Sequence, residues 1–412
     1  MKPVLLISYF FPPTGMAGSA RPYNLFRRLP EFGFQPLVLT VKPILFPAYD
    51  HSLLKPGDHK YITRTGSLDP ARIMKLIGRR QSPAPNRSGQ LSTLLTPDYK
   101  KLWNPFALSA ARKLIKKHSI RIVITTTPPP STHMIGLQLK KTTGIKWIAD
   151  FRDAWVSRRI EDAYSSTTQR AQCLKLLSEF KNKADRVVAV NESIGKYVHA
   201  DAIIPNGADN DLSRFWIDEN PPSPVFRIGY LGTPDLGAAL ESFVKELAGA
   251  LKDSGKKANK VEFRLVGVAD KTRIHKMFKN AGLAESLKIF RYLPKSDAFR
   301  KLSVCDLLLA TIPAQKMNHV TPSKIYDYLI SGKSIVAIAP VDSELAMIVR
   351  QNNHPTFEES QGHAIRGFLS QAMRTKATAI AEEATLTFSR ASVEEYGARM
   401  MAQRYSELLF SL

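Results

Sequence analysis

Residues that commonly build metal centres and disulfide frameworks are scarce in this sequence. Its 412 residues include only two cysteines, Cys173 and Cys305, which lie far apart. The nine histidines form no H-x-x-x-H motif, and there is no C-x-x-C motif. Because metal sites depend on such closely spaced ligands, we expect neither a metal ion nor another cofactor. So few cysteines favour a reducing compartment, with a single disulfide as the alternative.

Long apolar runs are also missing. No segment approaches the roughly 20 apolar residues that span a bilayer. The segment Val4–Phe11 is apolar and follows Lys2, but it is short, and two prolines follow it in place of a small-residue cleavage site. It therefore predicts a buried first strand and not a signal peptide. From these features we expect a cytoplasmic protein.

Acidic residues are scarce in the first half of the chain. Residues 1–200 carry 12 Asp and Glu against 32 Lys and Arg, whereas residues 201–412 carry 24 against 27. This asymmetry favours an anionic partner for the first half, such as a membrane surface, a pyrophosphate-linked acceptor or nucleic acid. A solvated basic surface that maintains solubility is the alternative. No recognisable nucleic-acid-reading module accompanies the charge, so we expect an anionic membrane surface and no nucleic acid.

The order of apolar runs and helical patterns predicts the fold class. Short aliphatic runs alternate with helical patterns over residues 1–205, and the alternation restarts over residues 206–391. Such alternation is typical of α/β proteins with parallel sheets and helices on both faces. We therefore predict two Rossmann-like domains facing across a cleft, with a helix over 392–412 that packs back on the first domain. The polar stretch 81–89 predicts a mobile loop.

The loop that follows the first strand has the composition of a ligand-binding turn. It contains Gly15 and Gly18, which allow a close approach of the backbone to a ligand, and it leads into a predicted helix over Ala20–Phe32 that includes Arg21 and that Gly33 ends. Free amides at a helix start favour phosphate, and an arginine there adds a charge-assisted contact. We expect the two glycines to contact the donor substrate and Arg21 to lie on the acceptor side. Packing glycines in a helix–strand turn are the alternative.

Two later strand ends carry hydroxyl, imidazole and charged side chains. Ser131 and His133 follow a strand at the start of a helix and are candidates for the acceptor side, with a helix cap and a locally bonded histidine as the alternatives. Asp150, Arg152 and Asp153 follow the next strand, where unpaired charges are costly unless they face a cleft. We expect these three to be catalytic, Asp153 above all. An internal Asp–Arg salt bridge is the alternative.

The segment Val320–Lys333 gives the strongest local signal. It predicts a short helix with a proline near its start and Gly332 at its end. We expect Asp327 to bind a ribose diol, as acidic residues do in dinucleotide folds, and Lys324 to neutralise a diphosphate. An intrahelical ion pair between the two is the alternative. Two hydroxyl residues beside them are further donor-site candidates: Thr321 and Ser323.

In combination these motifs resemble the family 4 retaining glycosyltransferases of the GT-B fold. The resemblance extends over nearly the whole chain, and its motifs occur in the family's order. They are Tyr9-Phe10-Phe11-Pro12-Pro13 with Gly15, Gly18 and Arg21, Pro97-Asp98 with Trp103, Pro128-Pro129-Pro130-Ser131-Thr132-His133, Asp150-Phe151-Arg152-Asp153-Ala154-Trp155, Ile204-Pro205-Asn206-Gly207, and Pro322-Ser323-Lys324-Ile325-Tyr326-Asp327-Tyr328.

The resemblance implies a metal-independent sugar transfer. The second half would hold a nucleotide-sugar donor, and the first half would hold a glycan or lipid-linked acceptor, as in cell-surface polysaccharide synthesis at the inner face of the membrane. The family's E-x7-E pattern is altered here, because His319 stands at its first position and Asp327 at its second. Many relatives place a basic residue after the first strand of the second half. Here Gly232 and Thr233 occupy that turn, and we expect both to lie at the donor.

Two other functions are compatible with the same residues. A nucleotide-sugar epimerase or hydrolase of this fold would have similar binding residues. A catalytically degenerate nucleotide-sugar-binding protein is suggested by His319 in place of the expected glutamate.

Overall fold

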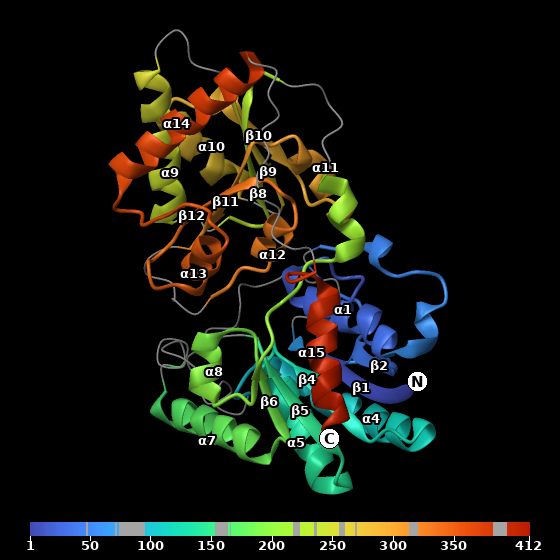
Figure 1. The fold of residues 1–412 in the computed structure, drawn as a ribbon. Helices are drawn as coiled ribbons and strands as arrows, with labels where there is room; N and C mark the ends of the chain where they lie inside the picture. The colour runs from blue at the N-terminus through green and yellow to red at the C-terminus, as the bar shows by residue number, and fades with distance from the viewer. Residues whose placement is uncertain are drawn as a thin grey trace. The chain divides into compact units, whose positions relative to one another are not determined.

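The computed structural model divides into two compact units. The first unit consists of Met1–Gly207 together with Ala398–Leu412, and the second of Ala208–Gly397 (Figure 1). The predicted loop 81–89, Asp153 and His319 lie outside the described residues. The structure describes residues 1–46, 48–70, 72–73, 95–152, 164, 166–216, 223–234, 237–254, 260–267, 270–312, 320–381 and 394–412.

The first unit is built on a sheet of seven parallel strands in the order β3-β2-β1-β4-β5-β6-β7. Side chains alternate between its two faces. In β1, Leu5 and Ile7 enter one apolar cluster, and Val4 and Leu6 enter the other. The strands are β1 (Lys2–Ser8), β2 (Phe34–Val41), β3 (Ile62–Thr65), β4 (Ile122–Thr126), β5 (Lys146–Phe151), β6 (Arg186–Ala189) and β7 (Ala202–Ile203).

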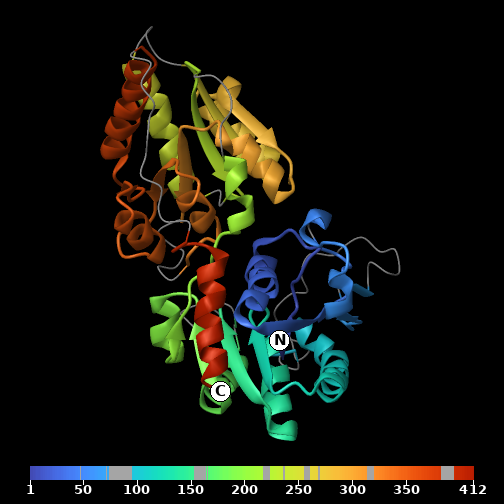
Figure 2. The ribbon, with the colours of Figure 1, turned by 45° about the vertical axis from the view of Figure 1, so that its right-hand side comes forward.

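Helices cover both faces of this sheet. One face packs against α4 (Asn104–His118), α5 (Ser131–Thr143), α7 (Thr167–Lys183) and α8 (Glu192–Val198). The other packs against α1 (Ala20–Arg28) and the C-terminal helix α15 (Ala398–Phe410). Figure 2 shows α15 lying along the first unit beside α1. The chain therefore returns from the second unit to complete the core of the first.

The second unit repeats the plan with six parallel strands in the order β10-β9-β8-β11-β12-β13. They are β8 (Phe226–Leu231), β9 (Val261–Val266), β10 (Leu287–Phe290), β11 (Leu307–Thr311), β12 (Ser334–Ile338) and β13 (Thr356–Phe357). One face packs against α9 (Ala238–Asp253), α10 (Lys271–Asn280) and α14 (Gly362–Ala381). The other packs against α11 (Lys295–Ser303), α12 (Lys324–Leu329) and α13 (Glu344–Gln351).

Short 3-10 helices connect these elements. They are η1 (Ala17–Ser19), η2 (Leu29–Phe32), η3 (His51–Leu53), η4 (Asp58–Tyr61), η5 (Tyr99–Trp103), η6 (Asn210–Trp216) and η8 (Ala284–Ser286). Within the described residues no helix is long and apolar enough to cross a membrane.

The predicted fold class is confirmed by the two parallel sheets with helices on both faces. The bounds of two helices differ from the predicted ones. The first helix was expected over Ala20–Phe32, but it tightens into η2 at Leu29, and Gly33 in the left-handed region (φ +85°) ends it. The last helix was expected from Ser392, and in the structure α15 begins at Ala398.

Candidate functional site

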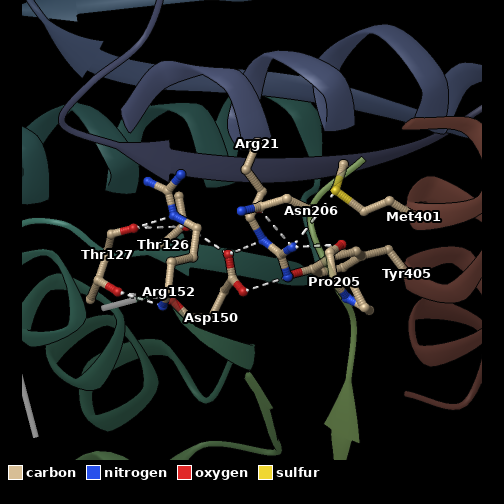
Figure 3. Close-up of polar contacts among 9 residues, drawn as sticks. All are labelled: Arg21, Thr126, Thr127, Asp150, Arg152, Pro205, Asn206, Met401 and Tyr405. Atoms are coloured by element: carbon tan, nitrogen blue, oxygen red, sulfur yellow. Dashed lines mark hydrogen bonds and ion pairs between the residues drawn. The ribbon is translucent and has the colours of Figure 1, made fainter. Parts of the chain in front are cut away.

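A buried ion pair lies where β4 and β5 of the first unit end. Arg21, in the first turn of α1, donates to both carboxylate oxygens of Asp150 from its Nε (3.0 Å) and Nη2 (2.9 Å). The Thr126 hydroxyl donates to the same carboxylate at 2.6 Å. Both charged side chains are at most 1% exposed. Figure 3 shows the guanidinium and the carboxylate directed at each other, with α15 on the far side of Arg21.

The same guanidinium also binds two further segments of the first unit, α15 and the loop at Pro205–Asn206. Its Nη2 donates to the Tyr405 hydroxyl at 3.0 Å, and its Nη1 donates to the Pro205 carbonyl at 3.1 Å and to Asn206 Oδ1 at 3.3 Å (Figure 3). Burial tends to raise the pKa of the Asp150 carboxyl, but Arg21 and Thr126 hold that pKa below its ordinary value. The pair is therefore charged and satisfied by the protein itself.

This geometry bears on two of the predicted site residues. Neither Arg21 nor Asp150 presents a free polar atom to a ligand, because each side chain is buried and bonded within the unit. The buried Arg21–Asp150 pair favours the alternative interpretation, in which the aspartate forms an internal ion pair with an arginine. The arginine that hydrogen-bonds to Asp150 is Arg21, and the charge of the neighbouring Arg152 also helps to lower the pKa of Asp150. A catalytic role for Asp150 and an acceptor contact for Arg21 stay predictions.

Arg152 is partly buried and joins two loops at the same edge of the sheet. Its guanidinium donates to the carbonyls of Thr127 and Gly18, the latter at 3.0 Å, and its backbone N–H donates to the Thr127 hydroxyl at 3.0 Å. Gly18 thus receives a contact from Arg152, and Gly15 donates its backbone N–H to Ala48. The Arg152 bonds fix the loop after β1 against the ends of β4 and β5, and the Gly15 bond joins it to the segment before η3.

Ser131 and His133 occupy the start of α5 and are both buried. Asp98 accepts from the Ser131 amide (2.9 Å) and hydroxyl (2.8 Å), so this helix start already holds a carboxylate of the chain itself. His133 Nδ1 lies 2.8 Å from the Thr125 hydroxyl, and its ring packs against Phe151 with centroids 4.4 Å apart. Burial lowers the pKa of His133 to about 3, so the imidazole is neutral at physiological pH. Both arrangements favour structural roles.

In the second unit, two glycine turns meet at the carboxyl ends of β8 and β9. Gly232 adopts a left-handed conformation (φ +92°) and donates its N–H to Val266 at 2.8 Å. A Cβ built on Gly267 would lie 2.6 Å from the Gly232 carbonyl oxygen, so only glycine fits there. The Tyr328 hydroxyl accepts from the Leu231 N–H at 2.8 Å and fixes the turn. Thr233, the next residue, is exposed.

Lys324 lies beside this turn without a carboxylate partner. It is partly buried, and its ammonium stands 3.4 Å from the centre of the Tyr230 ring. Among the residues that the structure describes, it forms no ion pair or hydrogen bond. Burial lowers the pKa of Lys324 well below its ordinary value. The alternative interpretation, an intrahelical pair with Asp327, is not formed, and a basic side chain without a counter-ion in the described residues remains at the carboxyl edge of the sheet.

Asp327 pairs instead with Lys295, which sequence reasoning did not single out. The Lys295 ammonium lies 2.7 Å from Asp327 Oδ1, and the carboxylate is 6% exposed. Burial raises the pKa of Asp327, and the ion pair with Lys295 opposes that shift. Its position in the sequence could have indicated a role at the site. Lys295 follows Pro294 just beyond the carboxyl end of β10, and therefore lies at the same edge of the sheet as Lys324. Two other donor-site candidates, Thr321 and Ser323, precede α12 and are partly buried.

Metal ligands do not cluster in the part of the chain that the structure describes. No group of three or more His, Cys, Asp or Glu side chains there could hold a metal ion. The two cysteines are buried and unpaired with each other.

Comparisons with known proteins identify the architecture. The sequence matches no protein-family model and no curated protein sequence. The structure is similar over its whole length to a sucrose-phosphate synthase from Thermosynechococcus elongatus (TM-score 0.59, 15% identity, 100% of both chains). It is also similar to the lipopolysaccharide outer core galactosyltransferase WaaB (TM-score 0.58, 12% identity, 100% of this chain and 99% of that one).

A third similar structure is a candidate UDP-N-acetylglucosamine 2-epimerase from Listeria monocytogenes (TM-score 0.53, 10% identity, 100% of this chain and 96% of that one). At these identities the likeness shows the fold alone. The chain has the GT-B fold of two Rossmann-like domains.

Proposed function

We propose that the protein is a retaining glycosyltransferase that moves a sugar from a nucleotide-sugar donor to a glycan or lipid-linked acceptor. One observation carries the proposal. Lys324 is a partly buried amine without a carboxylate partner among the described residues, beside the glycine turn at Gly232 and one helical turn from Asp327. A diphosphate would neutralise the ammonium, and a ribose diol would hydrogen-bond to the carboxylate. Similar transferase structures of the same fold support this proposal.

The proposed mechanism uses no metal ion and no protein nucleophile. The leaving diphosphate would take up negative charge as the bond to the sugar breaks, and Lys324 would stabilise that charge electrostatically. The same diphosphate would assist deprotonation of the acceptor hydroxyl on the face from which it left. Asp153, Arg152 and Asp150 remain the candidates for catalytic residues.

A panel assay tests the function. We would incubate the protein with UDP-glucose, UDP-galactose, UDP-N-acetylglucosamine, GDP-mannose and ADP-glucose, with and without a membrane extract as acceptor. A transferase releases nucleoside diphosphate in proportion to sugar incorporated, with the anomeric configuration of the donor retained. Interconversion of free nucleotide-sugars without incorporation would establish the epimerase alternative, which the epimerase-like neighbour of the same fold favours.

Asp327→Ala should weaken donor binding. If the carboxylate holds the ribose, its loss removes a hydrogen bond to a charged group, which contributes about 1.5–3 kcal/mol. Isothermal titration of the active nucleotide measures the change. Asp297→Ala, which removes an exposed carboxylate paired with Arg300 on the neighbouring helix α11, is the control. An unchanged donor affinity in Asp327→Ala would refute the ribose contact.

We also propose that the protein works at the inner face of the cell membrane, docking through α4. The exposed face of this helix carries four basic residues that form no ion pair with any described residue, and Phe106 at its start is 38% exposed. Each Lys or Arg near an anionic leaflet contributes about 1 kcal/mol, so four suffice for reversible binding. The four basic residues are Arg112, Lys113, Lys116 and Lys117.

Charge reversal on α4 should therefore release the protein from anionic vesicles. The triple substitution of Lys113, Lys116 and Lys117 by Glu should lower binding to phosphatidylglycerol vesicles at low salt by at least tenfold, as measured by sedimentation. The matched control reverses three exposed lysines of the second unit, Lys252, Lys271 and Lys288, and should retain binding. Equal losses in both variants would show that only net charge matters, and equal wild-type binding to neutral vesicles would contradict the docking.

A further inference from the structure

A second basic side chain that has no counter-ion among the described residues lies in the first unit, near the end of β3. Arg64 is partly buried, and its guanidinium donates only to backbone carbonyls, those of Pro12 and Val41. No carboxylate contacts it within the part of the chain that the structure describes. Burial lowers the pKa of Arg64 without an opposing charge. A guanidinium has five N–H donors, so several remain for a ligand.

The groups around Arg64 add to this positive charge. Arg72 donates to the Lys42 carbonyl, and Arg64 donates to the carbonyl of the preceding residue, Val41. The two guanidinium groups therefore lie close together at the carboxyl ends of β2 and β3, a region called here the corner of the sheet. Lys100 lies 3.5 Å from Asp69, whose carboxylate also accepts from the Tyr9 hydroxyl at 3.0 Å. Of the carboxylates that the structure describes, only that of Asp69 pairs with any of the three basic side chains Arg64, Arg72 and Lys100.

Arg64 is the member of this corner that remains open to a ligand. Arg72 is 4% exposed and cannot reach solvent freely, and Lys100 is engaged with Asp69 and with the Tyr9 ring, 4.6 Å from its ammonium. Arg72 and Lys100 therefore act through their charge, whereas Arg64 has both free donors and partial exposure. All three lie near the carboxyl ends of β1, β2 and β3, the edge where open α/β sheets bind ligands.

Holding the loop after β1 does not by itself account for Arg64. That loop is already joined to the segment before η3 without it, because Asp50 donates its N–H to the Pro13 carbonyl at 2.7 Å and Gly15 donates to Ala48 at 3.2 Å. Thr14 and Tyr49 form an antiparallel bridge between the same segments. A charged, partly desolvated side chain is a costly way to add one more carbonyl contact.

We propose that Arg64 binds a phosphate or pyrophosphate group of the acceptor substrate, within the electrostatic field of Arg72 and Lys100. Guanidinium groups recognise such oxyanions through paired hydrogen bonds. The inference rests on the proposed transferase function and specifies its acceptor as a phosphorylated molecule. It assigns the first unit an anion site separate from the donor diphosphate site of the second unit.

Titration with inorganic pyrophosphate and inorganic phosphate tests the site. The Lys324→Met variant serves as the starting protein, so that the donor diphosphate site contributes little. Adding Arg64→Met should weaken pyrophosphate binding at least tenfold, and Arg64→Lys, which keeps the charge but not the paired donors, should weaken it by a smaller factor. Arg121→Met, at the amino end of β4 and exposed, is the matched control and should bind as the starting protein does.

The outcomes separate the acceptor site from the donor site. If pyrophosphate binds more tightly than phosphate, the acceptor is a pyrophosphate-linked carrier. If the two anions bind with equal affinity, the acceptor is a phosphomonoester. Pyrophosphate affinity unchanged by both Arg64 substitutions would overturn the proposal. Nucleoside diphosphate binding to Arg64→Met alone should equal that of the wild type, so a failure of the donor site would appear independently in that titration.

Discussion

Replacing Arg21 by Met should destabilise the first unit by about 3–5 kcal/mol, because Asp150 would remain buried without its partner. The loss should also loosen α15, since Arg21 donates to Tyr405 on that helix. Urea denaturation followed by tryptophan fluorescence measures the change. Three of the four tryptophans belong to the first unit, so the signal reports mainly on it.

Two further variants show whether the loss of stability comes from breaking the buried Arg21–Asp150 pair or from any substitution in α1. Arg28→Met, which removes an ion pair with Glu31 at the surface, should cost no more than about 0.5 kcal/mol. Combining Arg21→Met with Asp150→Leu should recover part of the stability, because no unpaired buried charge then remains. If Arg21→Met were as stable as the wild type but inactive, the pair would be catalytic and not structural.

Lys324→Met should abolish most nucleoside diphosphate binding while leaving the second unit at least as stable as before. The ammonium has no carboxylate partner among the described residues, so the folded protein loses no ion pair, and burial disfavours its charged form. A charge-assisted contact to phosphate contributes about 1.5–3 kcal/mol, so affinity should fall roughly 10- to 100-fold. Calorimetric titration and thermal unfolding of the same samples provide both readouts.

Lys271→Met is the matched control for this substitution. Lys271 is exposed on α10 of the same unit, and its replacement should change neither nucleotide affinity nor the melting temperature. A fall in melting temperature with unchanged affinity in Lys324→Met would make the lysine a structural residue packed on Tyr230.

The sequence was sufficient to predict the fold class, two parallel sheets with helices on both faces, because apolar runs and helical patterns alternate along the chain. Strands such as β1 and β11 contain continuous apolar runs, typical of strands buried on both faces. Helix ends were less accurate. The change from α1 to η2 at Leu29 depends on local backbone geometry, although Gly33 marked the end of that segment in advance.

The partners of the charged residues could not be predicted in the same way. Arg21 meets Asp150 and Tyr405 across 129 and 384 residues of sequence, and Asp327 meets Lys295 in preference to Lys324 one turn away. Such pairs depend on how helices pack across a sheet, which local spacing does not encode. Of the candidate donor residues, Gly232 and Thr233 directly follow β8 at the carboxyl edge of the second sheet, whereas Gly15 and Gly18 belong to the first unit.

Titration of nucleoside diphosphates into the whole protein tests the central claim most directly. UDP, GDP, ADP and dTDP would be added separately to the wild type, Lys324→Met and Asp327→Ala, with calorimetric detection. The proposed donor site predicts that at least one nucleotide binds the wild type with one-to-one stoichiometry, and that both substitutions weaken this binding. Folded wild-type protein that binds none of the four, or binds one equally well in all three proteins, would contradict the proposed site.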